Sequence, residues 1–450
     1  MNIVISMMGR FQTNFWLGIA KNLSLNKSIS ISFICFDSES YEITNKSCFK
    51  TYKGWVKNDF TSNKETLLNK IKKLASKNKI SLKNHFFHEK ICFGFKSYNF
   101  LIQRLMDRYY NCEKILGNFE YESNTIVIQE LGGYLCNLSL FLAARNKNFT
   151  NYYIEPSLFS DRYFLLKNTY SGPVFFENKI PENIVIKNKL SVLKKVNLEK
   201  FLKEKPVSVP KIHQQRIVSP IFRLFSRKNI KRALEKYISS IFFKKHYEFG
   251  SINYYIYNFI LITINSILLK PFYLDILSSK FKNKKIIYYP LHVPSDMSLT
   301  IREPKFFNQL SLCKNILEEI GDDKVLVIKE HPTMKGSLNF IEFLKLKIKY
   351  KNLFLINPKI SNYKITRISN LVYTVNSKAG FEAILQGTET KVLGRSFYKN
   401  FSKSNEKSIL KSKAKHLLQS LYAYSSKGSL FSDDLEDIKE MSNTLLELLE

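Results

Sequence analysis

Short runs of aliphatic residues recur along the chain, and most are followed by a polar or glycine-bearing loop and then by a helix-forming segment. Continuous apolar runs of this length are typical of strands that are buried on both faces. Strands that alternate with helices predict parallel sheets covered by helices, and therefore an α/β fold. The predicted strands are residues 2–7, 29–36, 125–129, 151–155, 286–289, 324–329, 353–356, 371–375 and 391–393.

The grouping of these runs predicts two Rossmann-like domains, which agrees with a length of 450 residues. We expect an N-terminal domain at 1–165 and a C-terminal domain at 284–425. Residues 166–283 are basic and are predicted to form a partly helical linker or insert, irregular around 179–220. Residues 426–450 are predicted to form a C-terminal helix.

The chain carries 70 Lys and Arg against 38 Asp and Glu, a formal net charge of +32. A positive electrostatic field of this size favours anionic partners. The alternative is that the charged side chains only keep the surface solvated. We expect no nucleic-acid partner, since zinc-finger spacing, an aromatic-basic strand motif and an Arg-rich tail are all missing. Six cysteines without a Cys-x-x-Cys pair predict buried free thiols rather than a metal site or a disulfide framework.

Two segments of the middle region bear on membranes. Residues 254–269 are the most apolar stretch, but Asn258, Thr263 and Asn265 interrupt it. A spanning helix needs about 20 apolar residues, so we expect a buried or membrane-surface helix instead. Residues 223–246 are basic and amphipathic; they either lie on an anionic membrane or cover a core. Without a signal peptide pattern, we expect a cytoplasmic protein, with peripheral attachment to the inner face of the plasma membrane as a further expectation.

Charged residues follow the predicted strand at 324–329. Lys329-Glu330-His331-Pro332 lies at its carboxyl end, where open α/β sheets bind ligands. Lys329 can pair with a phosphate, and His331 can donate a hydrogen bond to a phosphate or a leaving oxygen. An ordinary charged strand end is the alternative.

Two further loops follow predicted strands of the same domain. Asn376 and Ser377 open a helix whose N–H groups favour an anion, although plain capping is the alternative. Glu382, one turn later, could accept hydrogen bonds from ribose hydroxyls. His292 and Asp296 follow the strand at 286–289. If these loops share one sheet edge, their side chains converge.

In the N-terminal half, glycines and a carboxylate also follow strands. Gly9, Gly132 and Gly133 lie where such a domain admits a ligand, although a tight turn is the alternative for Gly9. Glu155 ends the strand at 151–155. Glu155 and Asp296 are our candidates for a catalytic carboxylate, with an N-cap or a salt-bridge partner as the structural alternative.

The order of these motifs resembles the capsule polysaccharide biosynthesis proteins that include bacterial β-Kdo transferases. The resemblance covers roughly residues 125–165 and 285–400. That family has a Lys-Pro-His-Pro-like motif and an Asn-Ser-Thr-x-Gly-x-Glu-Ala-like motif. Here Glu330 replaces the usual Pro, Lys378 replaces the usual Thr, and His292 stands where Gln is common. Lys378 could add a phosphate contact.

The resemblance implies a GT-B-type fold and a glycosyltransferase that works without a metal or other cofactor. It implies a nucleotide-sugar donor, with a CMP-activated acidic sugar such as Kdo favoured, and a lipid-linked or oligosaccharide acceptor. Lys329, His331, Asn376, Ser377 and Glu382 would then hold the nucleotide phosphate and ribose. We count His331 also as a catalytic candidate.

Three other functions stay open at this point. A teichoic-acid-type polyol-phosphate transferase shares the fold and a His-Pro motif. Such an enzyme usually has an Asp before paired serines in the later loop, and Val375-Asn376-Ser377-Lys378 of this chain lacks both. A nucleotide-sugar epimerase would leave the basic middle segment without a role. A non-catalytic, membrane-associated assembly scaffold would account for the change from Pro to Glu at 330.

Overall fold

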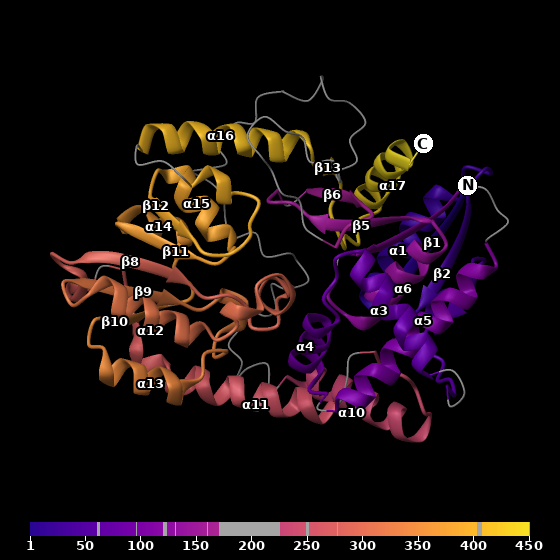
Figure 1. The fold of residues 1–450 in the computed structure, drawn as a ribbon, viewed down its shortest axis with the longest axis horizontal. Coiled ribbons are helices and arrows are strands. Elements are labelled where there is room, and N and C mark those ends of the chain that lie inside the picture. Colours follow the sequence, from indigo (N-terminus) through magenta and orange to yellow (C-terminus); the bar gives the residue numbers. More distant parts are fainter. Residues whose placement is uncertain are drawn as a thin grey trace.

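The computed structural model describes residues 1–60, 64–95, 97–119, 124–130, 132–159, 161–170, 226–248, 252–276, 278–402 and 407–449. The segment predicted to be irregular, 179–220, lies outside these residues. Within them the chain forms two sheets with helices on their faces, which confirms the predicted α/β, two-Rossmann, GT-B-type fold (Figure 1).

The N-terminal sheet has seven strands in the order β13-β6-β5-β4-β1-β2-β3. β1 to β5 run parallel, whereas β6 is antiparallel to β5 and β13 is antiparallel to β6. The order reverses between β1 and β4, as in doubly wound sheets. The strands are β1 (Asn2–Met7), β2 (Ser30–Cys35), β3 (Lys50–Lys53), β4 (Thr125–Glu130), β5 (Thr150–Pro156), β6 (Arg162–Lys167) and β13 (Ser426–Lys427).

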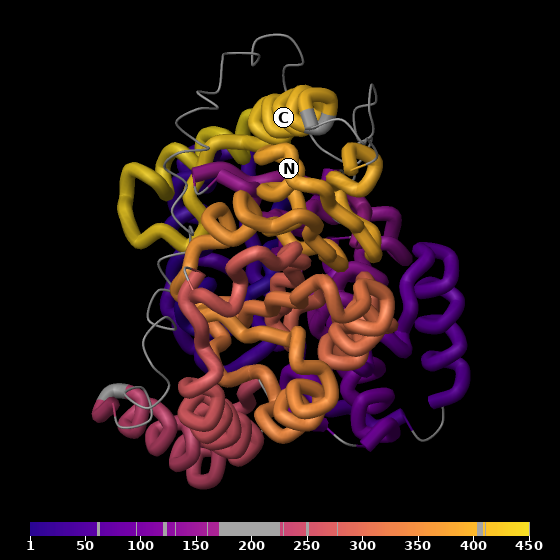
Figure 2. Tube along the Cα trace, turned by 90° about the vertical axis from the view of Figure 1, so that its left-hand side faces the viewer, coloured from indigo at the N-terminus to yellow at the C-terminus, as the bar shows by residue number. Residues whose placement is uncertain are grey.

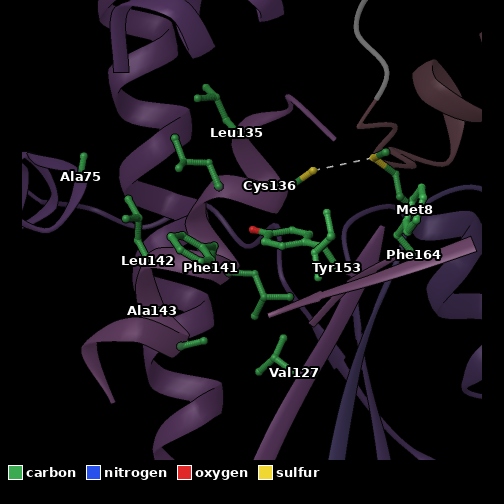
Figure 3. Close-up of a cluster of buried hydrophobic side chains, with 14 of the residues drawn as sticks. Met8, Ala75, Val127, Leu135, Cys136, Phe141, Leu142, Ala143, Tyr153 and Phe164 are labelled. Carbon is green, nitrogen blue, oxygen red and sulfur yellow. Dashed lines mark hydrogen bonds between the residues drawn. The ribbon is translucent and has the colours of Figure 1, made fainter. Parts of the chain in front are cut away.

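Helices cover both faces of this sheet. Val127 and Tyr153 point to one face and pack against Phe141 of α6 in the core (Figure 3). Ile126 and Ile128 point to the other face, where α1 and α17 pack. The helices of this half are α1 (Arg10–Leu23), α2 (Ser38–Thr44), α3 (Lys64–Lys77), α4 (Leu82–Phe93), α5 (Tyr98–Gly117), α6 (Leu135–Asn146) and α17 (Leu435–Leu449). All six cysteines are free thiols as predicted, and four are buried: Cys35, Cys112, Cys136 and Cys313.

The C-terminal sheet has six parallel strands in the order β12-β11-β8-β9-β10-β7. Its strands are β7 (Tyr273–Leu274), β8 (Lys285–Pro290), β9 (Lys324–Lys329), β10 (Leu353–Ile356), β11 (Leu371–Thr374) and β12 (Glu389–Val392). Alternate residues of β8 point to opposite faces of the sheet. Ile287 packs with α12 on one face, and Tyr288 packs with α14 and α15 on the other. Its helices are α12 (Gln309–Ile320), α13 (Phe340–Lys349), α14 (Asn362–Ile368), α15 (Lys378–Gln386) and α16 (Lys407–Ala423).

The chain returns to the N-terminal sheet at its end. β13 pairs with β6, and α17 packs against α1, so the two termini lie close together (Figure 1). The division of the chain at 165, 283 and 425 stays a prediction. β6 runs past the first of these positions, and β7 precedes the second.

Two helices of the middle region, α10 (Arg227–Phe242) and α11 (Ile252–Leu268), run along one edge of the molecule. Figure 2 shows the same pair at the lower end of the molecule after a quarter turn. Of the helices in the described ranges, none combines the length and the apolar character that crossing a membrane requires.

A buried ion network fastens the segment after α10 to the N-terminal domain. Glu248 is fully buried, and its two carboxylate oxygens lie 2.8 Å from Arg104 and 2.9 Å from Arg108, both on α5. Its backbone carbonyl also accepts a hydrogen bond from Arg104 (2.7 Å). Burial alone would raise the pKa of Glu248, but the two guanidinium groups outweigh it and hold the pKa well below its usual range. The carboxylate is therefore charged at every physiological pH.

Replacing Glu248 by Gln is expected to lower the free energy of unfolding by roughly 3–5 kcal/mol, since the buried guanidinium of Arg108 loses its carboxylate and that of Arg104 keeps only Glu89 (3.2 Å). Urea unfolding followed by tryptophan fluorescence measures this, because Trp16 and Trp55 both lie in the N-terminal half. The control is Lys314→Gln, which breaks the half-exposed pair with Glu318 (3.8 Å) and should cost at most about 1 kcal/mol. Equal costs for the two variants would contradict the importance of the network.

Candidate functional site

Two predicted site residues meet at the point where the strand order of the C-terminal sheet reverses. His292 follows β8, and Asn376 follows β11. In the sheet, β8 lies between β11 and β9. Loops diverge at such a switch point, which is where open α/β sheets bind ligands. The Asn376 amide nitrogen donates to the Ser298 carbonyl (3.1 Å), so its oxygen is left to accept from His292 Nε2 (3.0 Å). This contact gives His292 the Nε2–H tautomer.

The other ring nitrogen of His292 is a buried acceptor. The side-chain amide of Gln309 forms two hydrogen bonds with the His292 backbone. Its oxygen accepts from the His292 N–H (2.6 Å), and its nitrogen donates to the His292 carbonyl (3.1 Å). Burial lowers the pKa of His292, so the ring is neutral. Nδ1 is buried and has no hydrogen-bond partner within the described residues. Since buried polar atoms are normally paired, Nδ1 is suited to accept from a hydroxyl of a bound molecule.

A buried amine lies at the carboxyl end of the neighbouring strand. Lys329 ends β9 and is only 3% exposed, and its carbonyl accepts from Leu291 N after β8 (2.9 Å). Burial lowers the pKa of Lys329 to about 8, opposed by the nearby carboxylate of Glu382 on α15. Glu382 is buried as well. The structure thus brings Lys329 and Glu382, which were predicted from separate motifs, into one electrostatic environment.

Ser377 and Lys378 open α15. The Ser377 hydroxyl accepts from Ala379 N (3.2 Å), which is the capping role given as the alternative for this residue. The Lys378 ammonium donates to the carbonyl of Ser157 (3.4 Å), just after β5 of the other sheet. The start of α15 therefore touches both halves of the molecule.

His331 begins the short helix η6 (Pro332–Met334) and caps it. His331 Nδ1 accepts from the Thr333 backbone N–H (3.3 Å) and lies 2.8 Å from the Thr333 hydroxyl, so the ring carries its proton on Nε2. A proton on Nε2 is what the predicted role of His331 as a hydrogen-bond donor requires. The catalytic role itself stays a prediction.

Glu330, the residue that departs from the family pattern, has a structural role. It is 1% exposed, and one carboxylate oxygen accepts from the backbone N–H groups of Gly336 and Leu338, both at 3.0 Å. The other oxygen accepts from the hydroxyl of Tyr273 on β7 (2.6 Å). Glu330 therefore ties the loop after β9 to the edge of the sheet. The non-catalytic scaffold stays an alternative.

The short helix η4 (Ser298–Arg302) joins the two halves of the molecule. On its N-terminal-domain side, Thr300 Oγ1 lies 2.7 Å from His88 Nδ1 of α4, and the Ile301 carbonyl accepts from Asn84 (2.9 Å). Gly133 comes so close that a Cβ there would lie 2.3 Å from the Ile301 side chain. This close approach is why a residue without a side chain stands at 133.

The two carboxylates predicted as catalytic both contact η4. Glu155 forms an ion pair with Arg302 (3.4 Å), and exposed Asp296 accepts from Ser298 N (2.8 Å). The Glu155 contact is the salt bridge named as its structural alternative, whereas Asp296 contacts the first residue of η4, whose N-cap is Met297. Asp296 also raises the pKa values of His88 and His292, against a larger lowering by burial, so it lies near both rings. A catalytic role of either carboxylate stays a prediction.

Gly9 and Gly132 lie at the switch point of the N-terminal sheet. Gly9 caps α1 after β1, and its N–H donates to the carboxylate of Asp37 (2.5 Å). Gly132 follows β4 and lies beside Asn137 of α6. Substrate binding by Gly9, Gly132 and Gly133 stays a prediction.

Residues 60–120 are mostly helical in pattern, which agrees with α4, but sequence reasoning did not single out the polar side chains with which α4 lines η4. Burial lowers the pKa of His85 to about 4 and of His88 to about 3, so both rings are neutral. His85, His88, Glu89 and Cys92 recur at helical spacing, and this stripe of polar residues where an apolar face is expected could have singled them out. No three His, Cys, Asp or Glu side chains among the described residues form a group suited to a metal ion. Metal independence stays a prediction.

Replacing Glu330 by Ala is expected to lower the free energy of unfolding by roughly 2–4 kcal/mol, since two buried amides and the partly buried hydroxyl of Tyr273 lose their acceptor. Urea unfolding followed by circular dichroism measures the loss. Glu330→Gln is the control: its oxygen can still accept from Gly336 and Leu338, so it should cost about 1 kcal/mol or less. If Gln costs as much as Ala, the hydrogen bonds are not what stabilises the loop.

Comparison with solved structures finds similar chains at low identity. The KpsC beta Kdo 2,7 transferase of Thermosulfurimonas dismutans is 19% identical, with 78% of this chain and 97% of that chain covered, at a TM-score of 0.36. The beta Kdo 2,4 transferase of the same KpsC is 13% identical, with 73% and 87% covered, at a TM-score of 0.35. At these scores the similarities carry no weight in the assignment.

Among curated proteins, Protein FixF of Sinorhizobium fredii is 32% identical over 115 residues. The match covers 25% of this chain and 27% of that protein, so this chain matches only about a quarter of the relative's length. The model of the capsule polysaccharide biosynthesis protein family matches residues 194–419, which is half of the chain. This match includes the loops that bear His292, Lys329 and Asn376, and the chain belongs to the capsule polysaccharide biosynthesis protein family.

Proposed function

We propose that this protein is a glycosyltransferase that moves a sugar from a CMP-activated acidic sugar, such as Kdo, to a lipid-linked or glycan acceptor during surface polysaccharide synthesis. The observation that carries the proposal is the meeting of His292 and Asn376 at the switch point, beside the buried Lys329. These residues come from three loops that were predicted separately. Membership of the family supports the polysaccharide context.

The proposed reaction breaks the bond between the anomeric carbon and the phosphate oxygen of the donor, and the electron pair leaves with CMP. Lys329 and the N-terminus of α15 would stabilise the phosphate charge that develops. His331 would donate its Nε2 proton as a hydrogen bond to the same phosphate. Glu382 would accept hydrogen bonds from the ribose hydroxyls.

The acceptor hydroxyl oxygen forms the new bond to the anomeric carbon and loses its proton. Glu155 and Asp296 are the carboxylates that could take this proton, and both contact η4 between the two domains. Neutral His292, through Nδ1, would accept a hydrogen bond from a hydroxyl of the sugar and orient it.

A thermal-shift titration with CMP, CDP, UDP and GDP tests the donor site. CMP at about 100 times its Kd should stabilise the protein by about 2.7 kcal/mol, because a ligand that binds only the folded state stabilises it by mass action. Lys329→Met and His331→Ala should reduce the response to CMP at least about tenfold in Kd, since each removes a contact to the phosphate.

The matched control is Lys391→Met, which removes a surface lysine of β12 that pairs with Glu319 and should leave CMP binding unchanged. No response to any nucleotide, or equal responses in wild type and Lys329→Met, would refute the site. A response to UDP alone would favour the epimerase.

The pKa of Lys329 predicts how CMP binding depends on pH. Its ammonium is charged below a pKa of about 8 and neutral above it, so CMP affinity should fall as the pH rises through about 8. Calorimetric titrations from about pH 7 to about pH 9.5 should show a bend in log Kd near pH 8. Lys329→Met should lack the bend; the same bend in this variant would assign it to another group.

A further inference from the structure

The helices α10 and α11 present their large apolar side chains to solvent. On α10, Ile230, Leu234, Ile238 and Ile241 are between 46% and 55% exposed. Their spacing of three and four residues places them on one face. Of the two alternatives for this basic amphipathic segment, covering a core with its apolar face is therefore wrong for α10.

α11 shows the same orientation more strongly. Its outward residues include Ile256, Ile260, Ile264 and Ile267, each more than 40% exposed, whereas its two buried residues are Thr263 and Ser266. The helix has no Asp, Glu, Lys or Arg along its length. A helix of a water-facing surface has the opposite arrangement, with apolar residues inward and charged residues outward.

Contacts with both domains hold α11 in this orientation. Near its start, the Tyr254 hydroxyl donates to the Ile91 carbonyl of α4 (2.8 Å). Near its end, Asn265 accepts from Phe340 N of α13 (3.3 Å), and Gly336 approaches so closely that a Cβ there would lie 2.1 Å from the Ile262 carbonyl. The helix lies along the edge of the molecule beneath both sheets (Figure 1). Its apolar face is thus part of a rigid surface.

Positive charge lies beside this apolar face. α10 carries five basic residues and one acidic residue, Glu235. Contiguous exposed apolar residues on a soluble domain mark a surface that binds something apolar, and flanking Lys and Arg add attraction to anionic headgroups. The pair of helices therefore has the two properties of interfacial membrane helices.

We propose that α10 and α11 form a docking face for an anionic lipid bilayer, with the outward Ile and Leu side chains inserted at the level of the headgroups and acyl chains. The basic residues of α10 would contact the lipid phosphates. This proposal goes beyond the proposed function, because vesicle binding is measured without nucleotide and its failure leaves the donor site untouched.

Co-sedimentation with vesicles of phosphatidylglycerol and phosphatidylcholine tests the proposal. The full chain should sediment with these vesicles and less with pure phosphatidylcholine, since the headgroup charge adds to the binding. Ile260→Ser with Ile264→Ser should lower the partition coefficient at least about tenfold. Arg227→Gln, Lys231→Gln and Arg232→Gln together should lower binding to the anionic vesicles by a similar factor.

The matched control is Leu25→Ser with Leu435→Ser, which removes two side chains that are 81% and 80% exposed on the N-terminal half. It should bind vesicles as the wild type does, and circular dichroism should show all variants folded. The proposal is overturned if the wild type does not sediment, or if the Ile double variant behaves like the control. A dimer in analytical ultracentrifugation that the Ile double variant dissociates, together with no vesicle binding, would show that a second copy covers the face.

Discussion

The packing of η4 against α4 links the two halves of the molecule beside the candidate site. His88 and Asn84 bond to one side of η4, and Arg302 reaches Glu155 at the end of β5. On its other side, the Ser298 carbonyl holds the amide of Asn376, whose oxygen in turn accepts from His292. A movement of η4 would therefore displace the residues at the switch point of the C-terminal sheet. The candidate carboxylates Glu155 and Asp296 both contact η4, so their positions depend on it as well.

Burial, rather than net charge, sets the chemistry of the site. The formal net charge of the chain is +32, but the amine of Lys329 is buried and has a lowered pKa of about 8. Burial keeps His292 neutral, so Nδ1 acts as an acceptor. Glu330 is buried too, but its hydrogen bonds direct it to the loop and to Tyr273. Neighbouring residues of one motif thus have different roles.

Apolar runs predicted well those strands whose residues form a continuous run in the sequence. β9 and β10 begin and end at the predicted residues, β4 ends one residue later than predicted, and β5 is one residue longer at each end. α1 begins at Arg10, directly after its N-cap Gly9. β13 was missed because a two-residue strand exists only through its pairing with β6, about 260 residues away in the chain. The motifs predicted candidate site residues at the strand ends, but not the polar residues of α4 that contact η4.

The sequence by itself determined the α/β class and the residues at the carboxyl ends of the strands, because hydrophobic periodicity and strand direction are local properties. Only the tertiary structure decided that Glu330 ties a loop, that Glu155 pairs with Arg302 and that α4 contributes buried histidines. It also decided that the apolar faces of α10 and α11 point outward. These features depend on which distant segments pack together, and a pattern within one segment does not contain that information.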